Sequence, residues 1–498
     1  MASCDPTSGC GAVEVDDGTL CGPSDCSLAH ICLSGACTLV VPNEGSICAP
    51  KTPCQGSGAC HGNACVRPDA GALQPAWTYA SPSGFVDAQF HPIADEAGNL
   101  YFRVMERNDA GVFTGYQLSS VDRDGSVRWS VPMPTLVSAP LIDQGVVLYC
   151  ETLGSCHALS SSSGGAVWAF DPTAVLGSDA GYSYSPVSLG ADGVVISAQP
   201  QEQGTAGGGA ALLDWSTGAV IWSLADLRFS VAALADEAHN IYFVGEPAGE
   251  LPATNRHLSS VSRSGVFRWM TEPGGVDEYN TPIATYGGRL SVLTIGTNWA
   301  IDVSAIDGGV LAELDVSQTI NPGPISIFDG LQGWSRAVPS YDAGQPYGDC
   351  NDHLGQPGSV ASWDFGTGAM TFQHQLGPYG LSIHAEGPEL LEHDSVLLID
   401  ERSDCGDAGA RLVATLTAID AAGDETFSCQ IPTATKVPDF TGLVPLGAGR
   451  WAMVTYDATW YLAAYDLGVD PPAHGWTEGG IPYGLSGAGT AGNAHRPR

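Results

Sequence analysis

The sequence feature that most constrains the fold is a short motif in which a glycine is followed four residues later by a large side chain that opens a predicted strand. Its clear copies are Gly125–Trp129, Gly164–Trp168, Gly218–Trp222 and Gly265–Trp269. Weaker copies are Gly368–Phe372, Gly423–Phe427 and Gly308–Ala312. A unit of about 40 to 50 residues that recurs with strand alternation and without helical periodicity is typical of β-propellers and related repeat folds.

Each repeat contains four predicted strands, which in the third repeat cover residues 184–189, 193–198, 210–215 and 219–224. Repeats end near residues 131, 170, 224, 271, 316, 376 and 431, and a further one begins near residue 439. The sequence therefore predicts an all-β fold, an eight-bladed β-propeller of four-stranded blades over residues 76–478. We expect residues 76–80 to complete the last blade, because joining the first and last strands removes exposed sheet edges. Trp476 is the alternative closing residue.

A second repeat occupies the N-terminal region, where cysteines recur after 27 or 28 residues. Cys21, Cys26, Cys32 and Cys37 are followed in this way by Cys48, Cys54, Cys60 and Cys65, and Cys4 and Cys10 match the end of such a unit. The pattern resembles the cysteine-rich repeats of secreted myxobacterial proteins. We expect residues 1–66 to be a disulfide-rich stalk or spacer, because units this short have almost no core. Residues 67–75 are the predicted linker and 479–498 an extended tail, and we expect the natural protein to continue beyond residue 1, where a surface anchor could lie.

The motif from Asp214 to Trp222 resembles the tryptophan-docking repeats of the pyrroloquinoline-quinone-type, or quinoprotein-like, β-propellers. The resemblance covers roughly residues 76–476. It implies that the tryptophans wedge between neighbouring blades and are structural: Trp129, Trp168, Trp222 and Trp269. Cofactor-binding members of the family would hold the quinone against a vicinal cysteine pair, with calcium beside it. This chain has no Cys-Cys dipeptide, so we do not expect pyrroloquinoline quinone as a cofactor.

Composition excludes several classes of partner. The formal net charge is -36, from 54 acidic and 18 basic residues among 498. A polyanion repels phosphate backbones and acidic lipid surfaces, so we expect no nucleic-acid partner. No apolar run is long enough for a transmembrane segment.

Fifteen cysteines favour an oxidising compartment, so we expect a secreted or cell-surface protein.

The long predicted connections all belong to two types, which emerge on one face of a propeller. Those between the second and third strands of a blade cover residues 107–114, 199–209, 246–257, 336–358 and 401–410, and those between blades cover 171–184 and 272–280. Because recognition usually lies on loops held by a rigid scaffold, this face is the predicted site. We expect a disulfide between Cys350 and Cys405 in two of these loops, another between Cys150 and Cys156, and a free buried thiol at Cys429.

Aspartate and aromatic side chains lie close in sequence to the predicted Cys350–Cys405 bridge. Clustered carboxylates suit calcium, and the candidate ligands are Asp349, Asp352, Asp404 and Asp407. The alternative is a solvated acidic rim. Aromatic rings on the same face could stack on a sugar or a peptide, and the candidates for ligand binding are Tyr182, Tyr184, Tyr279, Tyr341, Tyr347 and His353.

No catalytic motif stands out in the sequence, and carboxylate pairs are too plentiful to identify a glycosidase site. The sequence therefore favours a non-catalytic binding protein that engages an extracellular protein or glycan through the long-loop face. One alternative is a propeller enzyme: a polysaccharide lyase or hydrolase, or a quinone-dependent oxidoreductase. Another is a structural subunit of an extracellular assembly.

Overall fold

The structure is a computed structural model of the whole chain and divides into two compact units. One comprises Met1–Gln74 with Phe427–Pro432, and the other Pro75–Thr426 with Thr433–Arg498. Beyond residue 72 it describes residues 73–87, 92–134, 140–151, 154–177, 180–183, 186–200, 208–225, 227–229, 234–236, 238–247, 257–271, 280–286, 288–294, 299–315, 322–329, 332–337, 359–364, 369–375, 389–391, 395–406, 409–420, 422–431, 443–457, 459–469 and 476–477. From the first 72 residues it describes Cys54 and short strands.

The N-terminal strands form small antiparallel sheets. They are β1 (Cys4–Asp5), β2 (Gly9–Cys10), β3 (Leu20–Ser24), β4 (Ala29–Leu33), β5 (Ala36–Val40), β6 (Ile47–Ala49), β7 (Gly58–His61) and β8 (Ala64–Val66). In each sheet the last two cysteines of a sequence repeat occupy directly paired positions: Cys4 with Cys10, Cys32 with Cys37, and Cys60 with Cys65. The repeat seen in the sequence is therefore also a repeat of strand pairing.

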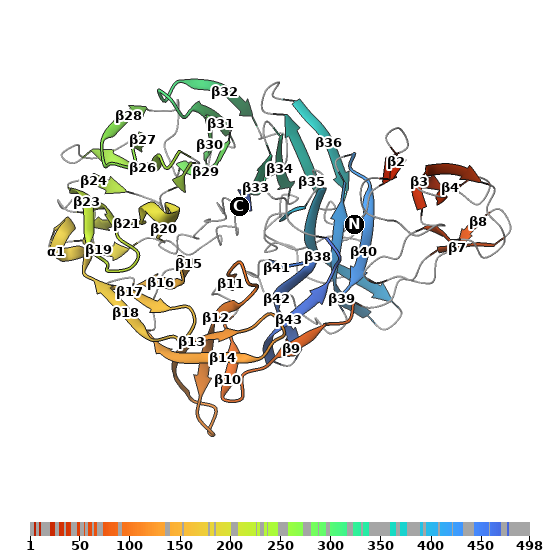
Figure 1. Cartoon of the computed structure of the whole chain (residues 1–498), viewed down its shortest axis with the longest axis horizontal. Coiled ribbons are helices and arrows are strands. Elements are labelled where there is room, and N and C mark those ends of the chain that lie inside the picture. The colour runs from red at the N-terminus through yellow and green to blue at the C-terminus, as the bar shows by residue number, and fades with distance from the viewer. Residues whose placement is uncertain are drawn as a thin grey trace. The chain divides into compact units, whose positions relative to one another are not determined.

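The larger unit is built from antiparallel sheets of four or five strands that resemble propeller blades (Figure 1). The first sheets hold β10 (Gly84–Val86), β11 (Ile93–Ala94), β12 (Leu100–Arg107), β13 (Phe113–Val121) and β14 (Val127–Met133); β15 (Leu141–Asp143), β16 (Val146–Cys150), β17 (Cys156–Ser160) and β18 (Ala166–Phe170); and β19 (Ala180–Ser183), β20 (Val187–Ser188), β21 (Val194–Pro200), β22 (Gly209–Leu213) and β23 (Val220–Ala225). Helix α1 (Pro172–Leu176) and the short 3-10 helix η1 (Gly190–Asp192) lie in connections.

The following sheets repeat this order of strands. They hold β24 (Leu227–Phe229), β25 (Leu234–Ala235), β26 (Ile241–Pro247), β27 (His257–Val261) and β28 (Phe267–Thr271); β29 (Asn280–Tyr286), β30 (Arg289–Thr294), β31 (Trp299–Ser304) and β32 (Val310–Asp315); β33 (Pro322–Asp329), β34 (Gln332–Ala337), β35 (Ser359–Asp364) and β36 (Ala369–Gln375), with β44 (Trp476–Thr477) beside β33; and β37 (Glu389–Leu391), β38 (Ser395–Gly406), β39 (Gly409–Ile419) and β40 (Glu425–Gln430). None of the helices in the described part of the chain is long and apolar enough to cross a bilayer.

The last sheet contains strands from both ends of the propeller sequence. It orders β41 (Val444–Gly447), β42 (Arg450–Asp457) and β43 (Thr459–Asp466), followed by β9 (Trp77–Tyr79). Tyr79 pairs with Leu462 and Trp77 with Ala464 in the antiparallel ladder. The prediction that residues 76–80 complete the last blade is therefore confirmed, and Trp476 instead pairs with Phe328 of β33.

Alternating residues on each strand pack against the sheets on either side, as the period of two along a strand requires. In β12, Leu100, Phe102 and Val104 belong to a buried cluster shared with the last sheet. Tyr101 faces the other way, into a cluster shared with the second sheet. The core is therefore divided into layers between neighbouring sheets.

Each repeated tryptophan joins its own sheet to the next. The indole of Trp168 donates a hydrogen bond to the carbonyl oxygen of Trp215 at 2.7 Å. It also covers Gly218, whose φ is +68° and where an added Cβ would lie 2.7 Å from the ring. The other indoles bind in the same way, Trp77 to Arg123, Trp129 to Ser161, Trp222 to Arg263 and Trp269 to Ala305. These contacts agree with the blade-docking role predicted for Trp129, Trp168, Trp222 and Trp269, and Trp77 makes the same kind of contact.

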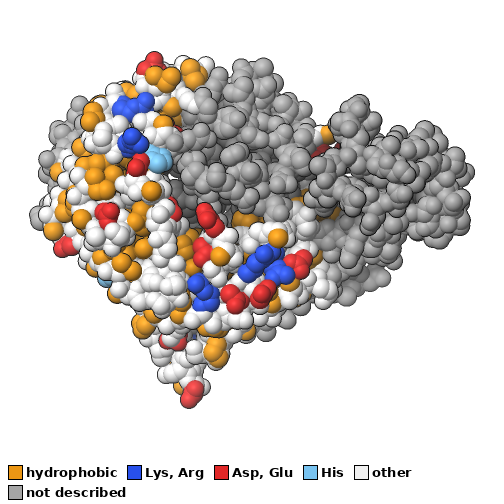
Figure 2. Space-filling model, viewed as in Figure 1, with side chains coloured by type: hydrophobic (Ala, Val, Ile, Leu, Met, Phe, Trp, Pro, Cys, Tyr) orange, Lys and Arg blue, Asp and Glu red, His pale blue; other side chains and the backbone are white. Residues whose placement is uncertain are grey.

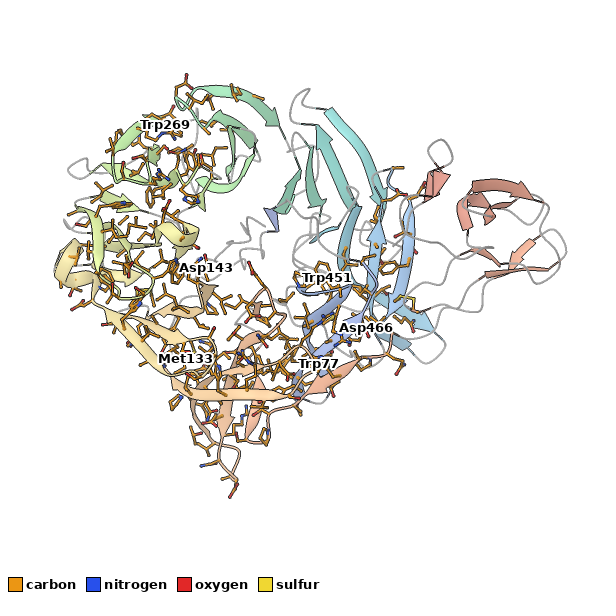
Figure 3. The ribbon with its side chains drawn as sticks, viewed as in Figure 1. Trp77, Met133, Asp143, Trp269, Trp451 and Asp466 are labelled. Carbon is orange, nitrogen blue, oxygen red and sulfur yellow. A yellow bond between two sulfur atoms is a disulfide. The ribbon has the colours of Figure 1, made fainter. Side chains whose placement is uncertain are left out.

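An arginine reinforces the junction between the last and first sheets. The Nε atom of Arg450 donates to Asp466 at 2.6 Å, and its Nη1 donates to Asp124 at 3.0 Å, in the turn that follows β13. The hydrogen bond with Asp466 raises the pKa of Arg450 above its ordinary value. Figure 3 labels Asp466 together with Trp77 and Trp451 in this region. Closure therefore combines strand pairing, an indole wedge and an ion pair.

Cysteine pairing confirms one prediction and corrects another. Cys150 and Cys156 form the predicted disulfide across the β16–β17 hairpin. Cys429 was expected to be a free thiol, but it is bonded to Cys54, 375 residues away in the sequence. The prediction was wrong because a strand position looks like a core position until the N-terminal repeats are brought beside it. These disulfides indicate an oxidising environment.

The long loop predicted at residues 401–410 is also corrected. Strands β38 and β39 pair without a break from Val396 with Ile419 to Gly406 with Gly409, so only two residues connect them. The Asp, Ser and Gly residues that suggested a loop lie on a sheet that extends further than its neighbours. Asp404, a predicted calcium ligand, is therefore paired with Arg411 within a ladder.

Candidate functional site

A pocket of about 620 Å³ lies in the larger unit where the first and last sheets meet. It is lined by Pro82, Ser83, Gly84, Phe85, Arg107, Asn108, Asp109, Thr459 and Trp460. These residues come from the connection that follows β9 together with the start of β10, from the β12–β13 hairpin and from the β42–β43 hairpin. Connections of these two types are the ones predicted to share a face, so the pocket belongs to the predicted recognition face.

The wall formed by β10 and β12 is fixed by close backbone pairing. Gly84 pairs with Glu106, and the backbone N–H of Arg107 donates to the carbonyl oxygen of Ser83 at 2.8 Å. A Cβ at Gly84 would collide with the carbonyl oxygen of Met105, so the glycine is needed for this approach. The wall is therefore a rigid part of the sheet.

Asn108 organises the tip of the β12–β13 hairpin, which projects at the lower edge of Figure 1. Its side-chain oxygen accepts hydrogen bonds from the backbone N–H groups of Ala110 at 3.1 Å and Val112 at 3.0 Å. Gly111 has a φ of +75° and donates to the backbone oxygen of Asn108 at 2.7 Å. Because the Asn108 side chain binds the backbone N–H groups of its own turn, it holds Asp109 and its neighbours in one conformation.

Arg107 is the cation of the pocket. Its guanidinium carbon lies 4.8 Å from the centre of the Phe85 ring, a cation–π distance. The neighbouring Glu106 is occupied, because its carboxylate accepts hydrogen bonds from the Ser83 hydroxyl at 3.2 Å and from the Gln117 amide. The arginine is thus placed by an aromatic ring and not by an acidic side chain.

A buried ion pair supports the same wall from within. The Nε atom of Arg103 donates to Asp87 at 2.6 Å, and the two side chains are 10% and 4% exposed. The guanidinium also lies 4.4 Å from the centre of the Tyr116 ring. Because Asp87 follows β10 and Arg103 lies in β12, the pair ties together the two strands that carry Phe85 and Arg107.

Trp460 forms the opposite side of the pocket. It lies at the start of β43, is partly buried, and packs against the cluster between the first and last sheets. Thr459 precedes it and is exposed. The pocket therefore combines two aromatic side chains with a cation, a carboxylate, an amide and hydroxyl groups. Such convergent polar groups on an aromatic lining are typical of small-ligand sites.

Two buried tyrosines at the opposite ends of the strands have a structural role. The Tyr101 hydroxyl donates to Asp95 at 2.8 Å, and the Tyr242 hydroxyl donates to Asp236 at 2.6 Å in the equivalent turn of another sheet. Burial raises the pKa of Tyr101 to about 12 and raises the pKa of Tyr242 as well. Both stay protonated near neutral pH and act as hydrogen-bond donors that fix the turns.

Most residues predicted for the site lie outside the described residues. These are Tyr184, Tyr279, Tyr341, Tyr347, His353, Asp349, Asp352, Asp407 and Cys350. Of the remaining three, Tyr182 lies in β19, and Asp404 and Cys405 lie in β38. The calcium site and the Cys350–Cys405 bridge therefore stay predictions.

Phe85, Trp460 and the specific role of Arg107 were not predicted from the sequence. Arg107 did begin one of the predicted long loops, but Trp460 was predicted only as a strand residue and nothing in the sequence singled out Phe85. They meet only because β9 joins the last sheet and brings the two ends of the propeller together. The available signal was the predicted closure of the ring combined with the position of each aromatic residue at a strand end on the loop face.

Among the residues that Figure 2 colours, acidic and basic side chains are interspersed, and neither sign forms one large field. Among these residues, acidity therefore does not by itself mark a site. Specific groups at the pocket are the better guide to function.

No family model and no curated protein matches the chain, but solved structures do. Quinohemoprotein alcohol dehydrogenase from Comamonas testosteroni is 12% identical with a TM-score of 0.50, over 79% of this chain and 76% of that one. Sqt1 from Saccharomyces cerevisiae is 8% identical with a TM-score of 0.51, over 79% and 98%. The computationally designed Ika8 protein is 10% identical with a TM-score of 0.50, over 79% and 99%. At these identities the similarity concerns the propeller fold alone, and it confirms the expected structural resemblance to quinoprotein-type propellers.

Proposed function

We propose that this protein is a secreted or cell-surface binding protein whose loop face engages a glycan. The observation that carries the proposal is the pocket that places Phe85, Arg107 and Trp460 together on that face. Its volume of about 620 Å³ falls within the range of small-ligand sites. A propeller of eight blades, closed by β9, is part of the same proposal.

The composition of the pocket favours a sugar over an apolar ligand. Aromatic rings cover the apolar face of a pyranose, while its hydroxyl groups need partners that both donate and accept hydrogen bonds. Asp109 supplies acceptors, Thr459 supplies a hydroxyl, and Arg107 supplies donors. Each buried hydroxyl of a sugar must find such a partner, since leaving one unpaired costs about 1–3 kcal/mol.

Placement of the pocket between two rigid sheets supports binding without turnover. The Asn108 turn and the Asp87–Arg103 pair hold its walls. A preformed site loses little conformational entropy when a ligand binds. The disulfides support the proposed secreted or surface location.

Glycan-array screening of the full chain, followed by calorimetry on the best ligands, tests the proposal. We expect Trp460→Ala to weaken binding about tenfold or more, since truncating an aromatic anchor typically costs at least 1–2 kcal/mol. Phe267→Ala is the matched control, because Phe267 is 49% exposed on β28 and is not part of the pocket. Loss of binding in both variants, or the absence of any glycan bound by the wild type, would contradict the proposal. Release of a sugar product would show that the protein is an enzyme and not a binding protein.

A further inference from the structure

Arg107 differs from the other arginines whose side chains the structure describes. Arg103, Arg263 and Arg450 pair with carboxylates, and Arg128 and Arg268 donate to hydroxyl groups. Arg123 donates to the carbonyl oxygen of Gly447. Arg107 has no hydrogen bond or ion pair from its side chain to any described residue, and its guanidinium lies against the Phe85 ring.

This arrangement leaves a cation ready for an outside partner. The chain carries 54 acidic residues against 18 basic ones, so an arginine that pairs with no carboxylate among the described residues is the less expected case. Glu106 is adjacent in sequence, but Ser83 and Gln117 occupy its carboxylate. A stacked guanidinium keeps five N–H donors in a planar fork, which matches the geometry of a carboxylate.

The geometry points to an acidic sugar as the ligand of this pocket: a uronic-acid-type ring whose carboxylate pairs with Arg107. This inference rests on the proposed glycan binding and narrows it to one substrate class. The carboxylate pairs with the guanidinium in a bidentate hydrogen bond, the ring packs beside Trp460, and the hydroxyl groups reach Asp109 and Thr459. The pocket lining contains one arginine, so a ligand with one carboxylate is enough to pair with it.

The net charge further limits the ligand to short oligosaccharides or chain ends. A formal charge of -36 repels a long polyanion, whereas a single carboxylate is attracted by the nearby guanidinium. Salt weakens repulsion beyond about 8 Å at physiological ionic strength, while a pair in direct contact is affected less. Added salt should therefore improve binding of long polyuronates relative to short ones, the reverse of the usual behaviour of a polyanion on a basic surface.

The test uses pairs of oligosaccharides that differ only in the oxidation state of C6: galacturonate with galactose, glucuronate with glucose, and mannuronate with mannose. Calorimetry on the full chain should show that at least one acidic trimer binds about tenfold or more tightly than its neutral counterpart, as expected for hydrogen bonds to a charged group. Arg107→Gln should remove that preference, and Arg107→Lys should keep part of it. Arg263→Gln makes the same change in net charge at a side chain that is 66% exposed outside the pocket, so it should leave the preference intact.

The outcomes separate the two levels of the hypothesis. If neutral trimers bind as tightly as acidic ones, or if Arg107→Gln keeps the preference, the acidic-sugar inference is wrong while glycan binding stands. If no sugar of either kind binds, the proposed function fails with it. If acidic peptides bind in an Arg107-dependent way and sugars do not, the pocket recognises protein and the inference is overturned.

Discussion

At the scale of single residues, the docking motif works because a glycine and an indole meet across a sheet boundary. Gly218 has a φ of +68°, and its missing side chain leaves room for the Trp168 ring. The same indole satisfies a backbone carbonyl group of the next sheet. Two requirements, a left-handed backbone and an empty Cβ position, therefore fall on one residue.

Replacing that glycine should be costly for both reasons. Gly218→Ala should lower the free energy of unfolding by about 2–4 kcal/mol, combining backbone strain with overpacking against the indole. The control is Gly288→Ala, because Gly288 has a φ of +80° but no atom within 4 Å of an added Cβ. Gly288→Ala should lower the free energy of unfolding by only about 1 kcal/mol, the cost of the backbone strain. Urea unfolding of both variants measures the difference, and equal losses would show that the ring does not fill the space.

The Asp87–Arg103 pair gives a second prediction at this scale. Asp87→Ala should destabilise the protein by about 3–5 kcal/mol, because it leaves a buried guanidinium without its carboxylate. The double variant Asp87→Leu with Arg103→Met should recover much of that loss, since both charges are gone. Chemical denaturation gives the free energies. A double variant as unstable as the single one would mean that packing, and not the uncompensated charge, causes the loss.

At the scale of elements, the strand that closes the last sheet also shapes the site. Strand β9 pairs with β43, and the chain that follows it supplies Ser83 and Phe85 to the pocket wall. The β42–β43 hairpin supplies Trp460 to the opposite side. Closure and pocket formation are therefore one event, and a weakened closure should weaken both.

Trp77→Ala tests this link. We expect a loss of about 3–5 kcal/mol in the free energy of unfolding, as for other large aromatic truncations, since the variant loses the contact with Gly125 and the hydrogen bond to Arg123. Phe113→Ala, at a ring that is 44% exposed on β13, should change stability by much less. Hydrogen exchange should show faster exchange in β43 for the tryptophan variant. If hydrogen exchange in β43 is unchanged, the Trp77 indole is not needed to keep β9 paired with β43.

At the scale of the whole molecule, a disulfide links segments far apart in sequence. Cys54 belongs to the N-terminal repeats, and Cys429 lies in β40. The backbone N–H of Leu73 also donates to the carbonyl oxygen of Gln430 at 2.7 Å. The N-terminal chain is thus held to this strand by a disulfide bond and by a backbone hydrogen bond.

Cleavage between the repeats and the propeller should reveal this bond. With a protease site inserted after residue 70, the cut protein should remain one species under non-reducing conditions and separate when dithiothreitol is added. Cys429→Ser should separate without reduction. Electrophoresis under denaturing, non-reducing conditions distinguishes these outcomes, and separation of the cut wild-type protein without a reductant would contradict the pairing.

The sequence alone determined the repeating all-β architecture, the docking role of Trp129 and its counterparts, the Cys150–Cys156 disulfide and the closing strand at residues 76–80. The repeating architecture and the short disulfide follow from spacing along the sequence. The docking role is what the family resemblance implies, and the closing strand follows from the need to remove exposed sheet edges. Only the tertiary structure decided that Cys54 bonds Cys429, that β38 and β39 form one long hairpin, and that Phe85, Arg107 and Trp460 line one pocket. The disulfide joins residues 375 positions apart, and the pocket joins residues from both ends of the propeller, which no repeat spacing relates. The β38–β39 hairpin depends on strand pairing through residues that were predicted as a loop.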